Sequence, residues 1–175
     1  MKAMQNLDKP HSTEPQASPL HLVLDTNIVL DWLIFNDPRI QHVLPLIQGK
    51  QVQLFASAST LAELERVLNY KNLALSPVQQ QTHFAYYQSQ VQVIDCPDNL
   101  PHLPLCRDPD DQKFLALAAC CQATALLSKD KRLLELDRPS MQRRYSLGFK
   151  ITLPETWHYP STLDNPKGKS RDFPA

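Results

Sequence analysis

The sequence predicts an α/β fold with three layers (α/β/α), in which helices cover both faces of a central, mostly parallel sheet. Two patterns support this prediction. Short apolar runs, typical of buried strands, alternate along the chain with longer stretches whose apolar residues recur every three or four positions, as in amphipathic helices. Strands separated by helices usually pair in parallel, because each connection crosses one face of the sheet.

The first half of the chain predicts two strands and three helices. Residues 21–24 (HLVL) form a brief apolar run, and residues 52–56 (VQLFA) form a second one. Residues 27–35 and 38–48 carry large apolar residues at helical spacing. Residues 61–68 place leucines three and four positions apart, which predicts a helix with one apolar stripe.

The second half continues the alternation. A helix is expected to start at Ser76 and Pro77, since serine is a favoured N-cap and proline a favoured first helical residue, and to run to about Gln90. A proline-rich loop then leads to a helix over residues 109–121, and a short helix follows Asp130. The remaining strands are expected at residues 91–94, 124–127 and 149–153.

The 175 residues are enough for one domain, which we expect to span residues 20–159. Residues 1–19 are polar and proline-bearing and predict a flexible lead, and residues 160–175 predict a C-terminal tail. No apolar run approaches the ~18 residues of a membrane span, and the N-terminus lacks the apolar core of a secretory signal. A cytoplasmic protein without membrane contact is the natural expectation.

The composition argues against several function classes. The 18 basic and 18 acidic residues balance, which disfavours a strongly basic nucleic-acid binder. The only glycines are at positions 49, 148 and 168, so the sequence contains no glycine-rich phosphate-binding loop. The six histidines form no i, i+4 pair, which weakens a zinc-hydrolase interpretation. We expect buried or incidental free thiols in a reducing compartment, rather than zinc ligands or disulfides, for Cys96, Cys106, Cys120 and Cys121.

Seven acids lie near the predicted ends of strands or near the starts of the helices that follow them. They are Asp25, Glu63, Glu65, Asp108, Asp110, Asp111 and Asp130. In a parallel sheet these segments open on one edge, where α/β proteins bind their ligands. Carboxylates brought together repel one another, and a divalent cation relieves that repulsion. Oxygen ligands of this kind suit Mg²⁺ or Mn²⁺.

Several of these acids also have a structural explanation. Asp108 precedes a proline as a helix N-cap would, and Asp130 can cap the helix that follows it. Thr60 and Glu63 fit a capping box. Asp25 is the hardest to explain in this way, because a carboxylate directly after an apolar strand needs a partner or a metal.

Four motifs, in this order, resemble those of the PIN-domain ribonucleases, especially the PIN proteins regarded as toxins of toxin–antitoxin systems (a PIN_3-like subgroup). The motifs are LVLDTN, LAELERVL, RDPDDQKFLALA and LLSKDKRLL, and the strand FKITLP follows them. The resemblance covers roughly residues 21–158. It implies a PIN-like version of the α/β/α fold and metal-assisted hydrolysis of RNA phosphodiester bonds by an endoribonuclease.

The resemblance also selects among the acids. It implies that the catalytic residues and ligands of Mg²⁺ or Mn²⁺ are Asp25, Glu63, Asp111 and Asp130. Helical periodicity alone leaves Glu65 and Asp110 as alternatives. Asp108 is expected to support the site or cap the helix, and Asn27 to hydrogen-bond the site or the phosphate, although a turn or cap role explains Asn27 equally well. One departure is Arg132, where subgroup members often carry another acid.

The sequence gives weaker signals for contacts with a substrate or a partner. A basic stretch with Arg138, Arg143, Arg144 and Tyr145 could hold single-stranded RNA, although a solvated loop explains it too. The resemblance leaves room for an antitoxin partner and for a homodimer. The apolar residues within 28–48 could serve such an interface, with core packing as the default explanation.

Two other functions compete with the nuclease. A haloacid-dehalogenase-type phosphatase also places an aspartate after its first strand, but it needs a second aspartate two positions on, where this chain has Asn27. A PIN fold without activity, serving as an RNA-binding or protein-interaction module, is disfavoured because all four acids are present.

Overall fold

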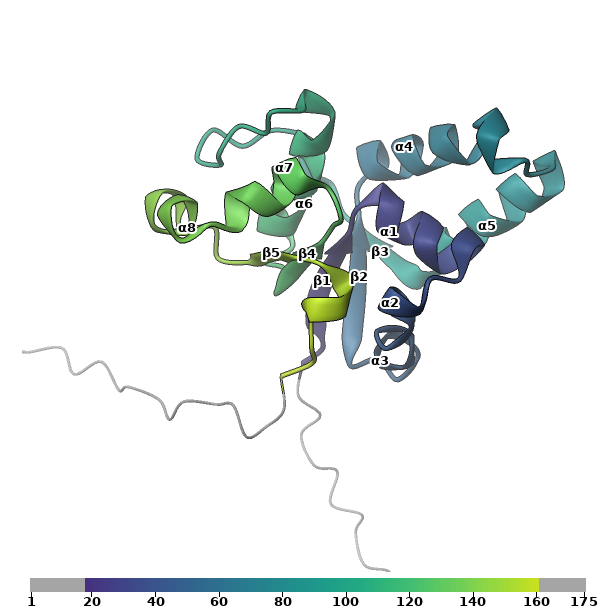
Figure 1. The fold of residues 1–175 in the computed structure, drawn as a ribbon, viewed down its shortest axis with the longest axis horizontal. Coiled ribbons are helices and arrows are strands. Elements are labelled where there is room, and N and C mark those ends of the chain that lie inside the picture. The colour runs from purple at the N-terminus through teal and green to yellow at the C-terminus, as the bar shows by residue number, and fades with distance from the viewer. Residues whose placement is uncertain (1–17, 161–175) are drawn as a thin grey trace, which may run out of the picture.

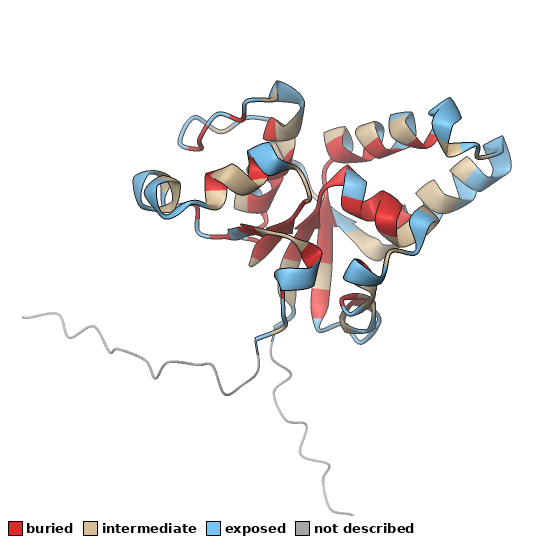
Figure 2. Cartoon of the chain, viewed as in Figure 1, coloured by how far each residue is buried: buried red, intermediate tan, exposed pale blue. Residues whose placement is uncertain are grey.

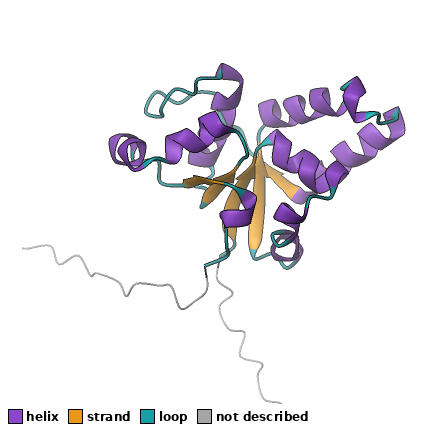
Figure 3. Cartoon of the chain, viewed as in Figure 1, coloured by secondary structure: helices purple, strands orange, loops and turns teal. Residues whose placement is uncertain are grey.

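Five parallel strands form the central sheet of the computed structural model, which describes residues 18–160 (Figures 1 and 3). The strands are β1 (Leu20–Leu24), β2 (Val52–Ala56), β3 (Val91–Val93), β4 (Ala125–Leu127) and β5 (Lys150–Thr152). Their order is β3-β2-β1-β4-β5, with Leu22 of β1 opposite Leu54 on one side and Ala125 on the other. Because β1 is central, the residue that follows it lies in the middle of the carboxyl edge.

One face of the sheet is covered by the helices from the first half of the chain (Figure 1). They are α1 (Thr26–Leu30), α2 (Pro38–Gln41), α3 (Leu44–Gln48), α4 (Ala58–Leu68) and α5 (Pro77–Gln90), with a π-helical turn at Asp31–Phe35 and a 3-10 turn at Lys71–Leu73. Leu22 and Leu24 of β1 pack into the core on this side. The alternation of side chains along β1 sends Val23 to the other face.

The second face is covered by α6 (Gln112–Cys120), α7 (Lys131–Leu134) and α8 (Pro139–Tyr145). Short 3-10 turns lie at Pro109–Asp111, Glu135–Asp137 and Pro154–Thr156. Phe114 and Leu115 of α6 are at most 1% exposed and fill the core beneath this layer. Figure 2 shows the buried residues concentrated in the sheet and on the helix faces turned toward it. The predicted three-layer α/β/α fold with a parallel sheet is therefore confirmed.

Three local predictions differ from the structure. The helix predicted over residues 27–35 becomes a π-helical turn after Leu30. The helix predicted over residues 38–48 is split into α2 and α3, because Pro45 lacks an N–H and its ring would clash with the carbonyl of Gln41 in a continuous helix. The basic stretch, for which a loop was one explanation, forms α8 with a proline in its first turn.

The prediction of free thiols is wrong for two of the four cysteines. Cys96, in the loop after β3, forms a disulfide with Cys120 at the end of α6, with 6.3 Å between their Cα atoms. Residue spacing does not reveal this contact, because it arises only when α6 folds back beside the loop. Cys106 and Cys121 are free and buried, and burial raises the pKa of their thiols to about 12 and about 11. Neither thiol therefore suits a nucleophile or a metal ligand at neutral pH.

The predicted lead over residues 1–19 and the predicted tail over residues 160–175 lie almost entirely outside the described residues. Within the described part of the chain, no helix has the length and apolar character needed to cross a bilayer.

Candidate active site

The structure places the four candidate acids on segments that meet at the carboxyl edge of the sheet, between the two groups of helices (Figure 1). Asp25 joins β1 to α1 and is only 3% exposed. Asp130 lies between β4 and α7. Asp111 ends the 3-10 turn that leads into α6, and Glu63 lies in the second turn of α4. Residues that are far apart in the sequence are thereby gathered at one edge.

These carboxylates lie near enough to one another to influence each other's pKa. The pKa of Asp111 is raised to about 7, first by burial and then by the negative charges of its neighbours Asp25, Asp130, Asp108 and Glu63. Burial also raises the pKa of Asp25, and the charges of Glu63 and Asp130 add to this effect. Mutual repulsion of this strength marks a site that attracts positive charge.

Asp25 is held by a hydrogen-bond chain that the sequence did not suggest. The hydroxyl of Ser128, which is fully buried, donates to Oδ2 of Asp25 at 2.7 Å and accepts from the backbone N–H of Asp130 at 2.9 Å. Both this hydroxyl and the backbone of Asn27 lower the pKa of Asp25, against the larger effect of burial. The signal available in the sequence was a serine at the end of an apolar strand, two residues before an aspartate.

Asp130 and Asp108 both cap helical turns. Oδ1 of Asp130 accepts from the backbone N–H groups of Arg132 at 2.6 Å and Leu133 at 3.3 Å. Oδ1 of Asp108 accepts from the N–H of Asp110 at 3.1 Å, and its Oδ2 lies 3.2 Å from Nη1 of Arg132. Arg132 therefore forms an ion pair with Asp108 at the border of the group of acids.

Glu63 does not form the capping box suggested by its spacing from Thr60. The N-cap of α4 is Ser57, three residues earlier, and Thr60 is its reciprocal partner. This frees the Glu63 carboxylate, whose Oε2 lies 2.6 Å from Nζ of Lys113 on α6. Glu65 is exposed and lies outside this contact.

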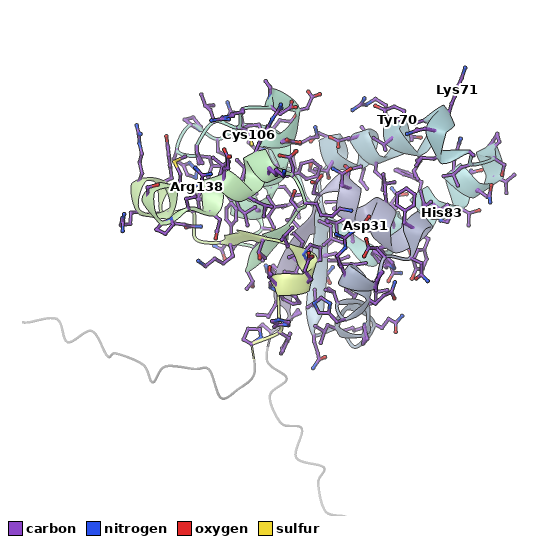
Figure 4. All side chains as sticks on the ribbon, viewed as in Figure 1. Asp31, Tyr70, Lys71, His83, Cys106 and Arg138 are labelled. Atoms are coloured by element: carbon purple, nitrogen blue, oxygen red, sulfur yellow. A yellow bond between two sulfur atoms is a disulfide. The ribbon has the colours of Figure 1, made fainter. Side chains whose placement is uncertain are left out.

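A second buried acid was missed by the sequence analysis. Asp31 is 5% exposed and its Oδ2 lies 2.5 Å from Nζ of Lys129. The pair ties the π-helical turn to the short segment between β4 and α7 that carries Ser128 and Asp130. Figure 4 shows Asp31 near the centre of the molecule, on the helix that follows β1.

Asn27 is exposed at the start of α1, two residues after Asp25, and it is its backbone that hydrogen-bonds the Asp25 carboxylate. The other predicted site residues lie further out. Arg143 and Arg144 are exposed on α8, and Arg138 precedes that helix and pairs with Glu135 at 3.3 Å. Figure 4 shows Arg138 on the α7–α8 side of the domain. The structure therefore does not bring the arginines of the basic stretch into the group of acids.

The donor set fits a hard divalent cation, because it consists of carboxylates whose repulsion such an ion relieves. The side chains are not drawn together around a common point, however. Among residues 18–160, no three acidic, histidine or cysteine side chains lie close enough to hold a metal ion. Glu63 is turned to Lys113 and Asp130 to the start of α7, so Asp25 and Asp111 are the acids not committed to a cation or a helix cap.

Comparisons with known proteins agree with the fold. No curated protein matches the chain. Among solved structures, VapBC2 from Rickettsia felis bound to a DNA fragment from its promoter is similar, with a TM-score of 0.50 and 14% identity over 77% of this chain and 98% of that one. PAE2754 from Pyrobaculum aerophilum is similar with a TM-score of 0.42 and 16% identity, over 66% of this chain and 84% of that one. A family model described as the PIN domain (PIN_3) matches residues 21–132, well over half of the chain. The chain therefore belongs to the PIN-domain family.

Proposed function

We propose that this chain is a divalent-metal-dependent endoribonuclease whose active site consists of Asp25, Glu63, Asp111 and Asp130. The observation that carries the proposal is the position of these four acids, which come from four different segments and face the carboxyl edge of one parallel sheet. The raised pKa of Asp111 agrees with this arrangement. A protein gains no stability from gathering partly buried carboxylates, so such a group indicates a function. Membership of the PIN-domain family supports a nuclease as that function.

Asp25 and Asp111 are the residues we assign to holding Mg²⁺ or Mn²⁺, with Glu63 and Asp130 completing the site directly or through water. A bound divalent ion would supply positive charge to the scissile phosphate and lower the pKa of a water that attacks it. Ser128 orients the Asp25 carboxylate through its hydrogen bond. Burial beside the core of the sheet keeps Asp25 in a low-dielectric setting, where its attraction to a cation is strong.

Cleavage of labelled single-stranded RNA in Mn²⁺ tests the activity. We expect cleavage by the wild type, none in EDTA, and a loss of at least about 100-fold in Asp25→Asn. Asp95→Asn is the matched control, because Asp95 also follows a strand but is exposed beside the edge strand β3. Cleavage that persists in EDTA and in Asp25→Asn would contradict the proposed site.

One observation favours a second candidate, an inactive PIN domain that binds RNA or protein. Two of the four acids are engaged with other groups, Glu63 with Lys113 and Asp130 with the N–H groups of α7. The same assay separates the two candidates. Retention of RNA on a filter without cleavage of any RNA in a diverse pool would favour the binding module.

We further propose that the protein is the toxin of a toxin–antitoxin pair and acts in the cytoplasm. The similar VapBC2 was crystallised on a DNA fragment from its own promoter. The exposed side chains of Phe35, Val78 and Tyr86 on the α1–α5 side are available to an antitoxin or to a second copy of the chain. The toxin–antitoxin pair would be supported if a small DNA-binding protein encoded by a neighbouring gene co-purifies with this chain and inhibits it. Light scattering of the purified chain measures its mass and shows whether it forms a homodimer.

A further inference from the structure

Lysine and arginine residues are distributed unevenly along the chain. Residues 72–106, which include α5, β3 and most of the loop after β3, contain none, whereas residues 107–150 contain nine of the chain's 18. The loop after β3 instead exposes two acids, Asp95 and Asp98. Positive charge is therefore concentrated on the side of the domain that carries α7 and α8.

Three of these cations gather around one carboxylate at the end of α7. Nη2 of Arg138 lies 3.3 Å from Oε1 of Glu135, and Nη1 of Arg107 lies 4.0 Å from Oε2. Lys131 lines the same surface hollow as Leu134, Glu135 and Arg138. The side chains of Arg107 and Arg138 are 78% and 65% exposed, and Lys131 is exposed as well. Three cations against one carboxylate leave a net positive surface, which we call the α7 patch (Arg107, Lys131 and Arg138).

The α7 patch borders the candidate acids. Lys131 directly follows Asp130, and Arg107 directly precedes Asp108. A nucleic-acid strand whose scissile phosphate lies at the acids has further phosphates on each side of it. The α7 patch offers those phosphates exposed positive charge one residue away from the site.

The loop that carries Arg107 is held in place by a buried side chain. The amide of Gln112 donates to the carbonyl of Pro104 at 3.2 Å and accepts from the N–H of Cys106 at 2.7 Å. Figure 4 shows Cys106 and Arg138 on the same side of the domain. The α7 patch is therefore built on a fixed loop and a helix, so binding does not have to order its backbone first.

We propose that the α7 patch binds the phosphate backbone of single-stranded RNA on one side of the cleavage position. This inference rests on the proposed function, from which it takes RNA as the substrate, and it names the surface along which the strand reaches the acids. Exposed ion pairs contribute only about 0–1 kcal/mol to stability, so stability does not account for three cations around one acid. RNA is favoured over an acidic protein because the patch is continuous with the acids that would cut the strand.

Fluorescence anisotropy of a labelled single strand of roughly ten nucleotides, titrated with the full chain in EDTA, measures binding without cleavage. Arg107→Gln/Lys131→Gln should weaken binding roughly tenfold. It should also lower the slope of log Kd against log salt concentration by about 1.4, because each phosphate contact to a single strand contributes about 0.7. Both effects should be the same on uridine and adenosine homopolymers, since phosphate contacts carry no sequence information.

Lys50→Gln/Lys71→Gln is the matched control, because it removes two exposed cations elsewhere, before β2 and beyond the far end of α4 (Figure 4). It should change the affinity by less than about twofold. An affinity and slope equal to those of the wild type in Arg107→Gln/Lys131→Gln would overturn the inference. Equal losses in the two double variants would overturn it too, since they would reflect net charge alone.

Glu135→Gln tests the α7 patch through a gain in binding, which unfolding cannot imitate. Removal of the one carboxylate frees Arg107 and Arg138 for phosphates, so binding should tighten roughly threefold, the scale of one exposed charge. Glu155→Gln removes the same charge from an exposed turn after β5 and should have no such effect. A folded Glu135→Gln that binds RNA no better than Glu155→Gln would overturn the inference.

Binding and cleavage separate this inference from the proposed function. If the wild type binds RNA through the α7 patch but cuts none in Mn²⁺, the nuclease fails and the patch stands as an RNA-binding surface. If the wild type cuts RNA and the patch variants bind it normally, the nuclease stands and the inference fails. The α7 patch would then suit the acidic surface of a protein instead.

Discussion

The hydroxyl of Ser128 joins the two central strands that carry Asp25 and Asp130, because it donates to Oδ2 of Asp25 at 2.7 Å from the end of β4. Ser128 also accepts from the N–H of Asp130, so one buried side chain sets the position of two candidate acids. The geometry at the centre of the site thus depends on a residue that bears no charge.

Ser128→Ala should destabilise the metal-free protein by about 1–3 kcal/mol, because a buried carboxylate loses its hydrogen-bond donor. Urea unfolding at pH 7 measures the change. Ser140→Ala, at an exposed position in α8, is the control and should leave the midpoint unchanged. Equal midpoints for Ser128→Ala and the wild type would show that water replaces the hydroxyl without cost.

Asp111→Asn should stabilise the metal-free protein above neutral pH. The pKa of Asp111 is raised from its ordinary value of 3.8 to about 7, so between these values the folded state binds more protons than the unfolded state. Stability is therefore lost as pH rises from about 4 to about 7. The advantage of Asp111→Asn should grow over that interval and level off above it, as followed by thermal unfolding in EDTA.

Asp110→Asn provides the neighbouring control for the same measurement. Asp110 is exposed and its carboxylate lies outside the group that raises the pKa of Asp111. Asp110→Asn should therefore not reproduce the gain in stability of Asp111→Asn. Saturating Mn²⁺ should remove the advantage of Asp111→Asn, because the ion stabilises only the wild-type site. An advantage that is the same at pH 5 and pH 8 would contradict the repulsion.

Removal of the disulfide should destabilise the oxidised protein by about 3 kcal/mol, since the bond between Cys96 and Cys120 closes a loop with a sequence separation of 24. Cys96→Ser/Cys120→Ser should unfold at a lower denaturant concentration than the oxidised wild type. Dithiothreitol should bring the wild type close to the double variant and leave the variant unchanged. If dithiothreitol also destabilises the double variant, its effect on stability does not come from reduction of this disulfide.

The arginines of α8 should contribute to binding of long RNA but not to the chemical step. Arg143→Ala/Arg144→Ala should weaken binding of a long single strand severalfold and reduce its salt dependence, because phosphate contacts release counterions. Cleavage of an RNA only a few nucleotides long should be unaffected, since α8 is remote from the acids (Figure 1). Equal losses on short and long RNA would contradict this separation.

The sequence predicted the layers of the fold well, because apolar runs and helical repeats are local signals. Asp25 also stood out, since burying a carboxylate directly after a strand costs free energy unless a partner or a metal ion compensates for it. Choosing Glu63 over Glu65 needed the family motif, because both lie beside the apolar stripe. The partner of Glu63 could not be foreseen, since Lys113 is fifty residues away and meets it only when α4 and α6 converge.

Other misses have the same origin. The pair of Asp31 with Lys129 and the disulfide of Cys96 with Cys120 both join segments far apart in the chain. The split of the helix at Pro45 was a local signal and could have been predicted from the missing N–H.

Because β1 lies at the centre of the sheet, sequence changes in some parts of the domain would disturb the candidate acids less than changes in others. The candidate acids follow β1, β2 and β4 or lie at the start of α6, whereas β3 and β5 form the two edges of the sheet. The long connection after β3 ends in Asp108 and Asp111 and is tied to α6 by the disulfide, so changes in it would move the acids. The helix before β5 carries none of the candidate acids and can vary in length and charge without altering their spacing. This peripheral helix is where engineering could change target preference while retaining the chemistry at the centre.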